Sequence, residues 1–383
     1  MGSYLLSHLH ALGGGVVAYL IPWLLVLSVV VFFHELGHFL VARWCSVKVL
    51  VFSIGFGPEI AGFYDRYGTR WKIAAIPLGG YVKFFGDENA GSAPDAARLE
   101  SMNDAERRQS FFFQPVLKRA AIVVAGPMAN FVLAVVIFAA LFAVYGKQTM
   151  SPRVDAVQSG SPAAAAGFQP GDLVVSIDGK PIDDFEDMQR IVSESAGDPL
   201  RIRVDRKGQE IALTATPALK EEKDLFGNVH RIGLLGIQHS PTPAEMTYRP
   251  VSPPRAFWMA LQETWMIVDR TLAYLGGVVT GHKSADQISG PIGIAHVVGQ
   301  AATISFAFVI RITAVISVSI GLLNLFPIPL LDGGHLLFYA IEALRGRPLS
   351  ERAQEVGFRI GLAIVVMLMI FATFNDIVHL RTS

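Results

Sequence analysis

The stretch Val29–Trp44, VVVFFHELGHFLVARW, places His34, Glu35 and His38 at the end of a long apolar run. Residues four apart lie on one face of a helix, so the two histidines can bind one metal ion together. The spacing H-E-x-x-H is typical of hydrolytic zinc sites, in which the glutamate takes a proton from the attacking water. It predicts His34 and His38 as zinc ligands and Glu35 as the general base.

The composition indicates a membrane protein. Of 383 residues, 52% are hydrophobic and only 17% are charged, which is too apolar for an ordinary soluble domain. The formal net charge is zero, so nothing in the balance of charge suggests nucleic acid as a partner. Cys45 is the only cysteine, which excludes an intramolecular disulfide and a cysteine-based zinc cluster.

Four segments are long and apolar enough to cross a bilayer as helices, which takes roughly 20 residues. They are residues 16–40, 120–145, 305–331 and 357–374. A fifth apolar segment, 256–281, carries Glu263, Asp269 and Arg270, and buried charges are costly in lipid. We expect this segment to be an amphipathic helix at the membrane surface.

Basic residues near the spans predict the orientation, because they concentrate on the cytoplasmic side. The connection 43–119 is rich in Lys and Arg, and the link before the fourth span holds Arg345, Arg347 and Arg352. We therefore expect these connections in the cytoplasm and both termini in the periplasm. The HELGH motif then lies near the cytoplasmic side.

The first connection also contains glycine-rich, alternating segments that predict β-hairpins within about residues 47–86. We expect them to be membrane-associated and to lie beside the motif, because non-helical backbone at that depth must be covered by protein or water. An edge strand near Gly55, Gly57, Gly79 and Gly80 could bind substrate by strand addition. The alternative is a structural plug beneath the spans.

The chain is expected to have four parts. Residues 1–146 form the N-terminal membrane half, and residues 301–383 form the C-terminal half. Between them, we expect residues 147–218 to form a compact periplasmic α+β domain. Residues 219–300 are expected to hold a linker and the amphipathic helix. The pattern G-S-P-A-A-x-A-G-x-x-x-G-D from Gly160 onward resembles PDZ domains of bacterial membrane proteases. The expected fold class is thus a polytopic α-helical membrane protein with an inserted PDZ domain.

A catalytic zinc site needs a third protein ligand, which must come from another apolar segment. The candidates are Asp332 and His335 in NLFPIPLLDGGHLLF. An unpaired carboxylate would be costly in such surroundings, whereas metal coordination removes that cost. Pro327 and Pro329 break the helix and allow the chain to bend toward the metal. On these residues alone, Asp332 and His335 both remain candidates for the third ligand.

HELGHFLVAR and NLFPIPLLDGGHLLF, with a PDZ-like module between them, closely resemble the site-2 protease family, in its regulator-of-sigma-E protease branch. GPMANF and ISGPIGIA extend the resemblance over essentially the whole chain. It implies that Asp332 completes the zinc site with His34 and His38, and that Asn324 holds the substrate. The chain departs from well-studied relatives in showing one PDZ module where they carry two.

The resemblance implies an intramembrane zinc endopeptidase of the bacterial inner membrane that takes part in a sigma-factor stress response. Its expected partners are membrane lipid and single-span membrane proteins, such as pre-trimmed anti-sigma factors and signal-peptide remnants. The PDZ module is expected either to capture peptides or to exclude substrates with large outer domains. Two other functions use the same residues: a metal transporter and a catalytically silent membrane scaffold.

Overall fold

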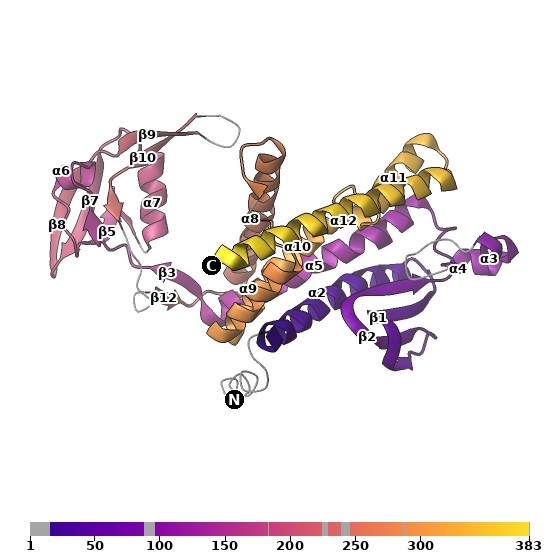
Figure 1. Cartoon of the computed structure of the whole chain (residues 1–383). Coiled ribbons are helices and arrows are strands. Elements are labelled where there is room, and N and C mark those ends of the chain that lie inside the picture. The colour runs from indigo at the N-terminus through magenta and orange to yellow at the C-terminus, as the bar shows by residue number, and fades with distance from the viewer. Residues whose placement is uncertain are drawn as a thin grey trace. The chain divides into compact units, whose positions relative to one another are not determined.

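The structure is a computed structural model of the full chain, and it describes residues 16–87, 96–182, 184–223, 229–238, 246–285 and 288–382 (Figure 1). The amino-terminal residues 1–15, whose periplasmic location was expected, lie outside the described residues. The chain divides into two compact units. Residues 1–139 and 257–383 form the first unit, and residues 140–256 form the second.

Within the described residues, four helices are long and apolar enough to cross a membrane (Figure 1): α2 (Val16–Trp44), α5 (Val116–Tyr145), α10 (Phe306–Asn324) and α12 (Glu351–Thr382). A helix bonds its backbone groups within the segment, which is the condition for crossing lipid. The predicted class of polytopic α-helical membrane protein is therefore confirmed.

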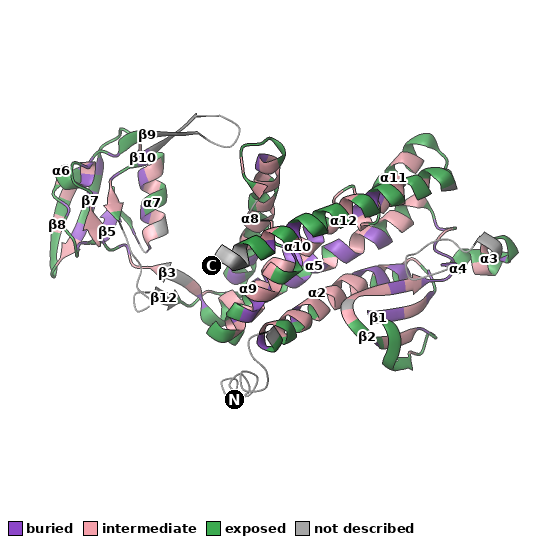
Figure 2. Ribbon diagram, viewed as in Figure 1, coloured by how far each residue is buried: buried purple, intermediate pink, exposed green. Residues whose placement is uncertain are grey.

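The surface of α12 has the character expected of a lipid-facing helix. Many of its positions are exposed (Figure 2), and the exposed residues include Leu362, Met367 and Ile370. In water, such a row of large apolar side chains would mark an interaction surface. On a helix of this length, lipid is the solvent that suits them.

The third span ends earlier than expected. The prediction continued it to residue 331, whereas α10 ends at Asn324 and a separate helix, α11 (Asp332–Arg345), begins at Asp332. Pro327 and Pro329 have no N–H to donate, and Leu330 adopts a left-handed φ of 108°. The break therefore places Asp332 in the first turn of a new helix.

A short apolar helix, α9 (Pro291–Ile304), explains the ISGPIGIA motif. The main-chain N–H groups of Gly290 and Gly293 each donate to the carboxylate of Asp376 in α12, at 2.9 Å. A Cβ on Gly293 would lie 2.5 Å from Asp376 Oδ1. The glycines thus let the start of α9 pack directly on a buried carboxylate of α12.

β1 (Val49–Tyr64) and β2 (Arg70–Phe84) form an antiparallel hairpin that curls on itself. Phe52 pairs with both Val82 and Trp71, so the first half of β1 lies between the two ends of β2. The small helices α3 (Ala96–Ser101) and α4 (Asp104–Gln109) follow the hairpin.

The glycines singled out in the hairpin shape its bend. Gly55, Gly57 and Gly79 have φ values of 88°, 84° and 135°, which residues with a side chain rarely adopt. A Cβ on Gly79 would also lie 2.5 Å from the Phe56 ring. These three glycines are therefore required for the curl of the hairpin itself.

The turn of the hairpin is tied to the end of α2. Asp65 accepts hydrogen bonds from the Trp71 indole, from main-chain N–H groups of the turn and from Arg43 of α2. Burial alone would raise the pKa of Asp65, but these donors outweigh it and lower the pKa to about 2. The carboxylate therefore stays ionised and holds the hairpin against α2.

The second unit is an α+β domain with its own core. A four-stranded sheet has the order β6–β5–β7–β8. Its strands are β5 (Leu173–Ile177), β6 (Lys180–Pro181), β7 (Leu200–Arg206) and β8 (Gln209–Ala215), and its helices are α6 (Pro162–Ala166) and α7 (Phe185–Glu194). Buried Val174, Ile202 and Val204 lie in this core.

The predicted domain boundary at residue 218 is too early. The segment expected as a linker contains β9 (Ala218–Lys223), β10 (Val229–Leu234), β11 (Ile237–Gln238) and β12 (Met246–Arg249). β11 pairs with β4 (Ala156–Val157), and β12 pairs with β3 (Lys147–Met150). Leu235 is buried in the core of the unit. The helix α8 (Pro253–Val279) follows.

Candidate metal centre

The two histidines of the H-E-x-x-H motif lie one turn apart on α2 and face α5. The two helices approach closely because both carry glycine there: a Cβ on Gly37 would lie 2.2 Å from the Ala125 carbonyl oxygen, and one on Gly126 would lie 2.2 Å from His38 Nε2. His38 Nδ1 lies 2.9 Å from the carbonyl oxygen of Ile122, which can only accept. His38 is therefore protonated on Nδ1, and its Nε2 is available as a ligand.

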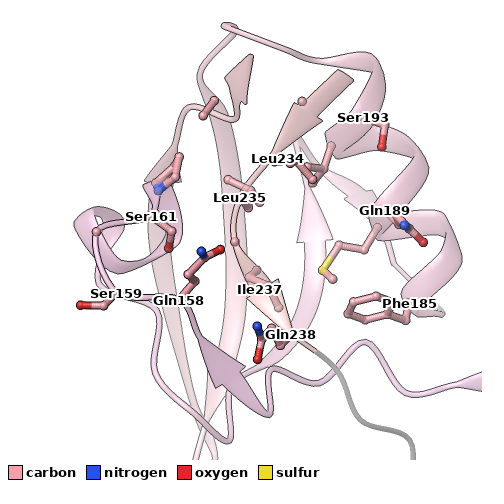
Figure 3. Close-up of a pocket in the computed structure, with 17 residues that line it drawn as sticks. Gln158, Ser159, Ser161, Phe185, Gln189, Ser193, Leu234, Leu235, Ile237 and Gln238 are labelled. Atoms are coloured by element: carbon pink, nitrogen blue, oxygen red, sulfur yellow. The ribbon is translucent and has the colours of Figure 1, made fainter. Parts of the chain in front are cut away.

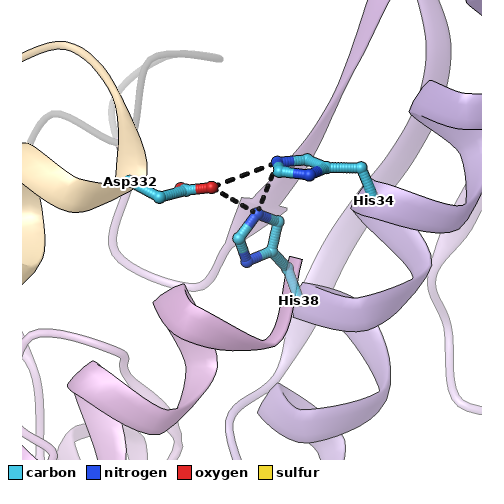
Figure 4. Close-up of side chains that lie close together, drawn as sticks. All are labelled: His34, His38 and Asp332. Carbon is cyan, nitrogen blue, oxygen red and sulfur yellow. Dashed lines mark hydrogen bonds and ion pairs between the residues drawn. The ribbon is translucent and has the colours of Figure 1, made fainter. Parts of the chain in front are cut away.

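Asp332 reaches the same point from the start of α11 (Figure 4). Its Oδ2 lies 3.1 Å from His34 Nε2 and 3.6 Å from His38 Nε2, and the two Nε2 atoms are 3.2 Å apart. These three residues form the group that could hold a metal ion within the described part of the chain. Folding thus brings Asp332 next to His34 and His38, although nearly three hundred residues separate them in the sequence.

The geometry fits a zinc ion. Zinc bound to nitrogen at about 2.0–2.1 Å in a tetrahedron requires ligand atoms about 3.3 Å apart, close to the three distances observed. Asp332 Oδ2 is buried and makes no hydrogen bond of acceptable direction with the described residues. A bound cation would satisfy that oxygen and the two facing nitrogen lone pairs at once. Two histidines and one carboxylate are a common catalytic zinc set.

Glu35 follows His34 on α2 and lies against β2. A Cβ on Gly80 would be 2.9 Å from Val31 Cγ1 and 3.1 Å from Glu35 Cγ, so no larger residue fits there. Glu35 and Gly80 both line a cavity of about 810 Å³ that also includes the three residues of the metal group. The glutamate therefore has access to the space in which a substrate would meet the metal.

The same cavity brings together some of the expected substrate-binding residues. Asn324 and Gly80 line it, whereas Gly55, Gly57 and Gly79 do not belong to its described lining. These three glycines, with their positive φ values, allow the hairpin to bend. His335, the rival third ligand, also lines the cavity, but its ring packs against Phe358 and Tyr339 and is not part of the metal group.

Two contacts around the metal group depend on how the helices pack against one another. Arg119 of α5 and Glu342 of α11 form an ion pair at 2.6 Å, with the guanidinium over the Tyr339 ring, in the cavity wall. Asn130 of α5, which lies in the GPMANF motif, is 3.2 Å from His34 Nδ1 through its amide nitrogen. Both depend on which faces of α2, α5 and α11 meet, and no local pattern gives that information.

A second cavity, of about 420 Å³, lies within the second unit (Figure 3). It is a groove between α7 and the segment containing β10 and β11. Its apolar lining includes Phe185, Leu235 and Ile237, and its polar lining includes Gln189 and Gln238. The described lining of the groove consists of apolar and uncharged polar residues.

A zinc-type ligand set in a cavity with polar and apolar walls, among apolar helices, defines a class: metallohydrolases embedded in a membrane. The comparisons with known proteins identify the family. The chain belongs to Peptidase family M50, the site-2 proteases, whose family model matches residues 22–368. It is a zinc-dependent metalloprotease.

Relatives are similar over nearly their whole length. A protein of Agrobacterium fabrum, provisionally named a zinc metalloprotease, is 49% identical over 372 residues, which cover 97% of this chain and 99% of the relative. A protein of Rhizobium meliloti with the same provisional name is 49% identical over 360 residues, covering 94% and 96%. Metalloprotease MmpA of Caulobacter vibrioides is 43% identical over 385 residues, covering 95% and 96%.

Proposed function

We propose that this site-2-type protease cleaves the transmembrane segments of single-span membrane proteins, as in the regulator-of-sigma-E branch. The observation that carries the proposal is the convergence of His34, His38 and Asp332 on one point of a cavity, between helices suited to lipid. Candidate substrates are pre-trimmed anti-sigma factors and signal-peptide remnants, which meet the enzyme within the bilayer of a bacterial inner membrane.

In this proposal His34, His38 and Asp332 hold the zinc ion, and Glu35 is the catalytic base. When bound, zinc polarises the scissile carbonyl and makes a water molecule more acidic. Glu35 takes a proton from that water and returns one to the leaving amine. The amide of Asn324, which can donate and accept, holds a main-chain group of the substrate in the cavity.

A transmembrane substrate must lose helical hydrogen bonds before it can be cleaved, because its carbonyls are bonded within the helix. The final segment of β2 can replace those bonds. Gly80, Tyr81, Val82 and Phe84 line the cavity, while the first half of β1 pairs with this segment on its other side. Strand addition to this edge would present an extended substrate to the metal. The competing role is a plug, in which the hairpin only packs beneath the helices.

For the second unit we propose a PDZ domain on the periplasmic side that acts as a steric filter. Support comes from the sequence pattern that starts at Gly160 and from the groove beside α7. A filter would admit substrates whose outer domains have been removed. Peptide capture in the groove is the alternative role.

The proposed orientation has both termini in the periplasm and the metal site near the cytoplasm, supported by the basic residues of 43–119 and by Arg345 and Arg347. Water and the polar product ends would then reach the site from the cytoplasmic side. A metal transporter would need repeated halves and a continuous path, which the sequence does not suggest.

Replacement of Glu35 tests the proposal. Glu35→Gln keeps the size of the side chain and removes its basicity, so zinc content should stay at one per chain while cleavage of a single-span reporter in proteoliposomes falls about 10²- to 10⁴-fold. Glu355→Gln, at an exposed position of α12, is the matched control. Cleavage at the original rate by Glu35→Gln would contradict the assignment, and a silent scaffold would show no cleavage even in the unaltered protein.

A further inference from the structure

The side chain of Asn130 contacts the outer nitrogen of His34. Asn130 is fully buried in α5, and its amide nitrogen lies 3.2 Å from His34 Nδ1. On the other side of the same amide, Oδ1 is buried and has no hydrogen-bond partner among the described residues. An orphaned buried oxygen next to a proposed metal ligand calls for an explanation.

The requirements of His34 provide that explanation. For Nε2 to offer a lone pair to a metal, the proton of the neutral ring must be on Nδ1. An N–H at Nδ1 then needs an acceptor, and the Asn130 amide nitrogen can only donate. A half-turn of the amide exchanges its nitrogen and oxygen without changing its shape. It brings Oδ1 to the Nδ1–H of His34, and the amide nitrogen takes the position that the oxygen held.

We infer that Asn130 is a positioning residue for the metal centre, whose side-chain carbonyl accepts the Nδ1–H of His34 and fixes the tautomer and ring orientation of that ligand. The inference rests on the proposed function, because it takes His34 to be a metal ligand. Metal-binding histidines typically donate their second ring N–H to such an acceptor, which raises their basicity.

The partner histidine supports this assignment. His38 donates from its Nδ1 to the carbonyl oxygen of Ile122, two turns before Asn130 on the same helix. Along α2, His34 precedes His38. Along α5 the order of their partners is reversed, because Ile122, the partner of His38, precedes Asn130, the partner of His34. One acceptor is a main-chain carbonyl and the other is a side-chain carbonyl, so α5 orients both rings.

Asn130 is itself held from a third helix. Its main-chain carbonyl accepts a hydrogen bond of 2.9 Å from the Ser317 hydroxyl of α10. A Cβ on Gly321 of α10 would lie 3.1 Å from the Cβ of Asn130, so this residue of α10 must stay small. Ser317 hydrogen-bonds the main chain of Asn130 and not its amide, which makes it a control for a purely structural role.

The experiment measures zinc affinity by competition with a chelator in the purified full-length protein, together with the visible spectrum of the cobalt-substituted form. Asn130→Leu keeps the volume and removes the acceptor, and zinc affinity should fall about 10- to 100-fold with an altered cobalt spectrum. Asn130→Asp keeps an acceptor, and its affinity should stay within a few-fold of the original. Ser317→Ala should leave both readouts unchanged.

The outcomes separate the inference from the proposed function. His34→Ala should abolish stoichiometric zinc, and retention of zinc by that variant would overturn the ligand set and the inference together. If His34→Ala loses zinc but Asn130→Leu binds it as tightly as the original, only the inference fails. Equal losses in Asn130→Leu, Asn130→Asp and Ser317→Ala would mean that Asn130 merely joins helices. Asn130→Ala replaces the leucine variant if the latter does not fold.

Discussion

The two cavities of this molecule differ in the chemistry of their walls. The cavity of the first unit brings His34, Glu35, His38 and Asp332 together, and its wall also holds the ion pair of Arg119 and Glu342. The groove of the second unit has a lining of apolar and uncharged polar residues, with no charged member among those described. Burying several ionisable groups is costly unless a metal or a partner compensates them. The difference places the ionisable residues suited to metal chemistry in the first unit.

The largest expected effect comes from disturbing the fit between α2 and α5. Gly126→Ala adds a Cβ where it would lie 2.2 Å from His38 Nε2, so the histidine must move off the metal position. We expect loss of stoichiometric zinc and a fall in cleavage of about 10³-fold or more. Metal analysis and reporter cleavage are the measurements.

Gly276→Ala in α8 is the control for this change, because a Cβ there meets nothing within 4 Å. Unchanged zinc content in Gly126→Ala would show that the close approach of the helices does not determine the metal site. The packing of α2 against α5 would then not explain why the cavity of the first unit, and not the groove of the second, holds the metal group.

A smaller effect is expected in the groove. Leu234→Asp places a charge in the lining of the groove, and Leu219→Asp places one on β9, outside it; both leucines are exposed. If the second unit is a steric filter, cleavage of a reporter with a short outer segment should change less than about threefold, below the effect of a typical binding contact. A tenfold loss confined to Leu234→Asp would indicate peptide capture and contradict the filter.

Loss of the ion pair between Asp172 and Arg206 should have the smallest effect on cleavage but a clear effect on the stability of the second unit. Asp172 is fully buried, which alone would raise its pKa, but hydrogen bonds from Arg206 and the Gln169 N–H lower its pKa below the ordinary 3.8. The carboxylate therefore stabilises the second unit at neutral pH, and this contribution is lost as pH falls below about 3.8 through the native pKa.

Hydrogen exchange of the β7 amides in the full chain measures this effect. Protection should fall on acidification in the unaltered protein, and Asp172→Asn should be less protected at pH 7 and less sensitive to acid. An acid response in Asp172→Asn equal to that of the unaltered protein would assign the effect to other groups. Cleavage of the short reporter at pH 7 should change little, since the metal centre belongs to the first unit.

Two kinds of site residue could be predicted from the sequence: those that follow the helical repeat, and those whose burial in an apolar segment would be costly without a partner. His34, Glu35 and His38 follow the helical repeat, and Asp332 stood out as a carboxylate in an apolar stretch. The choice of Asp332 over His335 depended on resemblance, because both lie within the same short segment. The structure brings Asp332 to the histidines and turns His335 toward aromatic neighbours.

Features that depend on two distant segments could not be predicted in the same way. Asn130 is a neighbour of His34 only in the observed register of α2 against α5. The two-residue strand β11 has no alternating pattern of its own, and it exists because β4 pairs with it. For the same reason, the boundary at residue 218 was wrong. Local periodicity carries no information about such pairings.

The central claim is that Asp332 completes the metal centre begun by the H-E-x-x-H motif. Zinc stoichiometry of purified Asp332→Ala and His335→Ala tests it most directly, because the two residues lie one turn apart on α11 and both line the cavity. The account predicts that Asp332→Ala loses stoichiometric zinc while His335→Ala keeps one zinc per chain. Full zinc retention by Asp332→Ala, or its loss only in His335→Ala, would contradict the account.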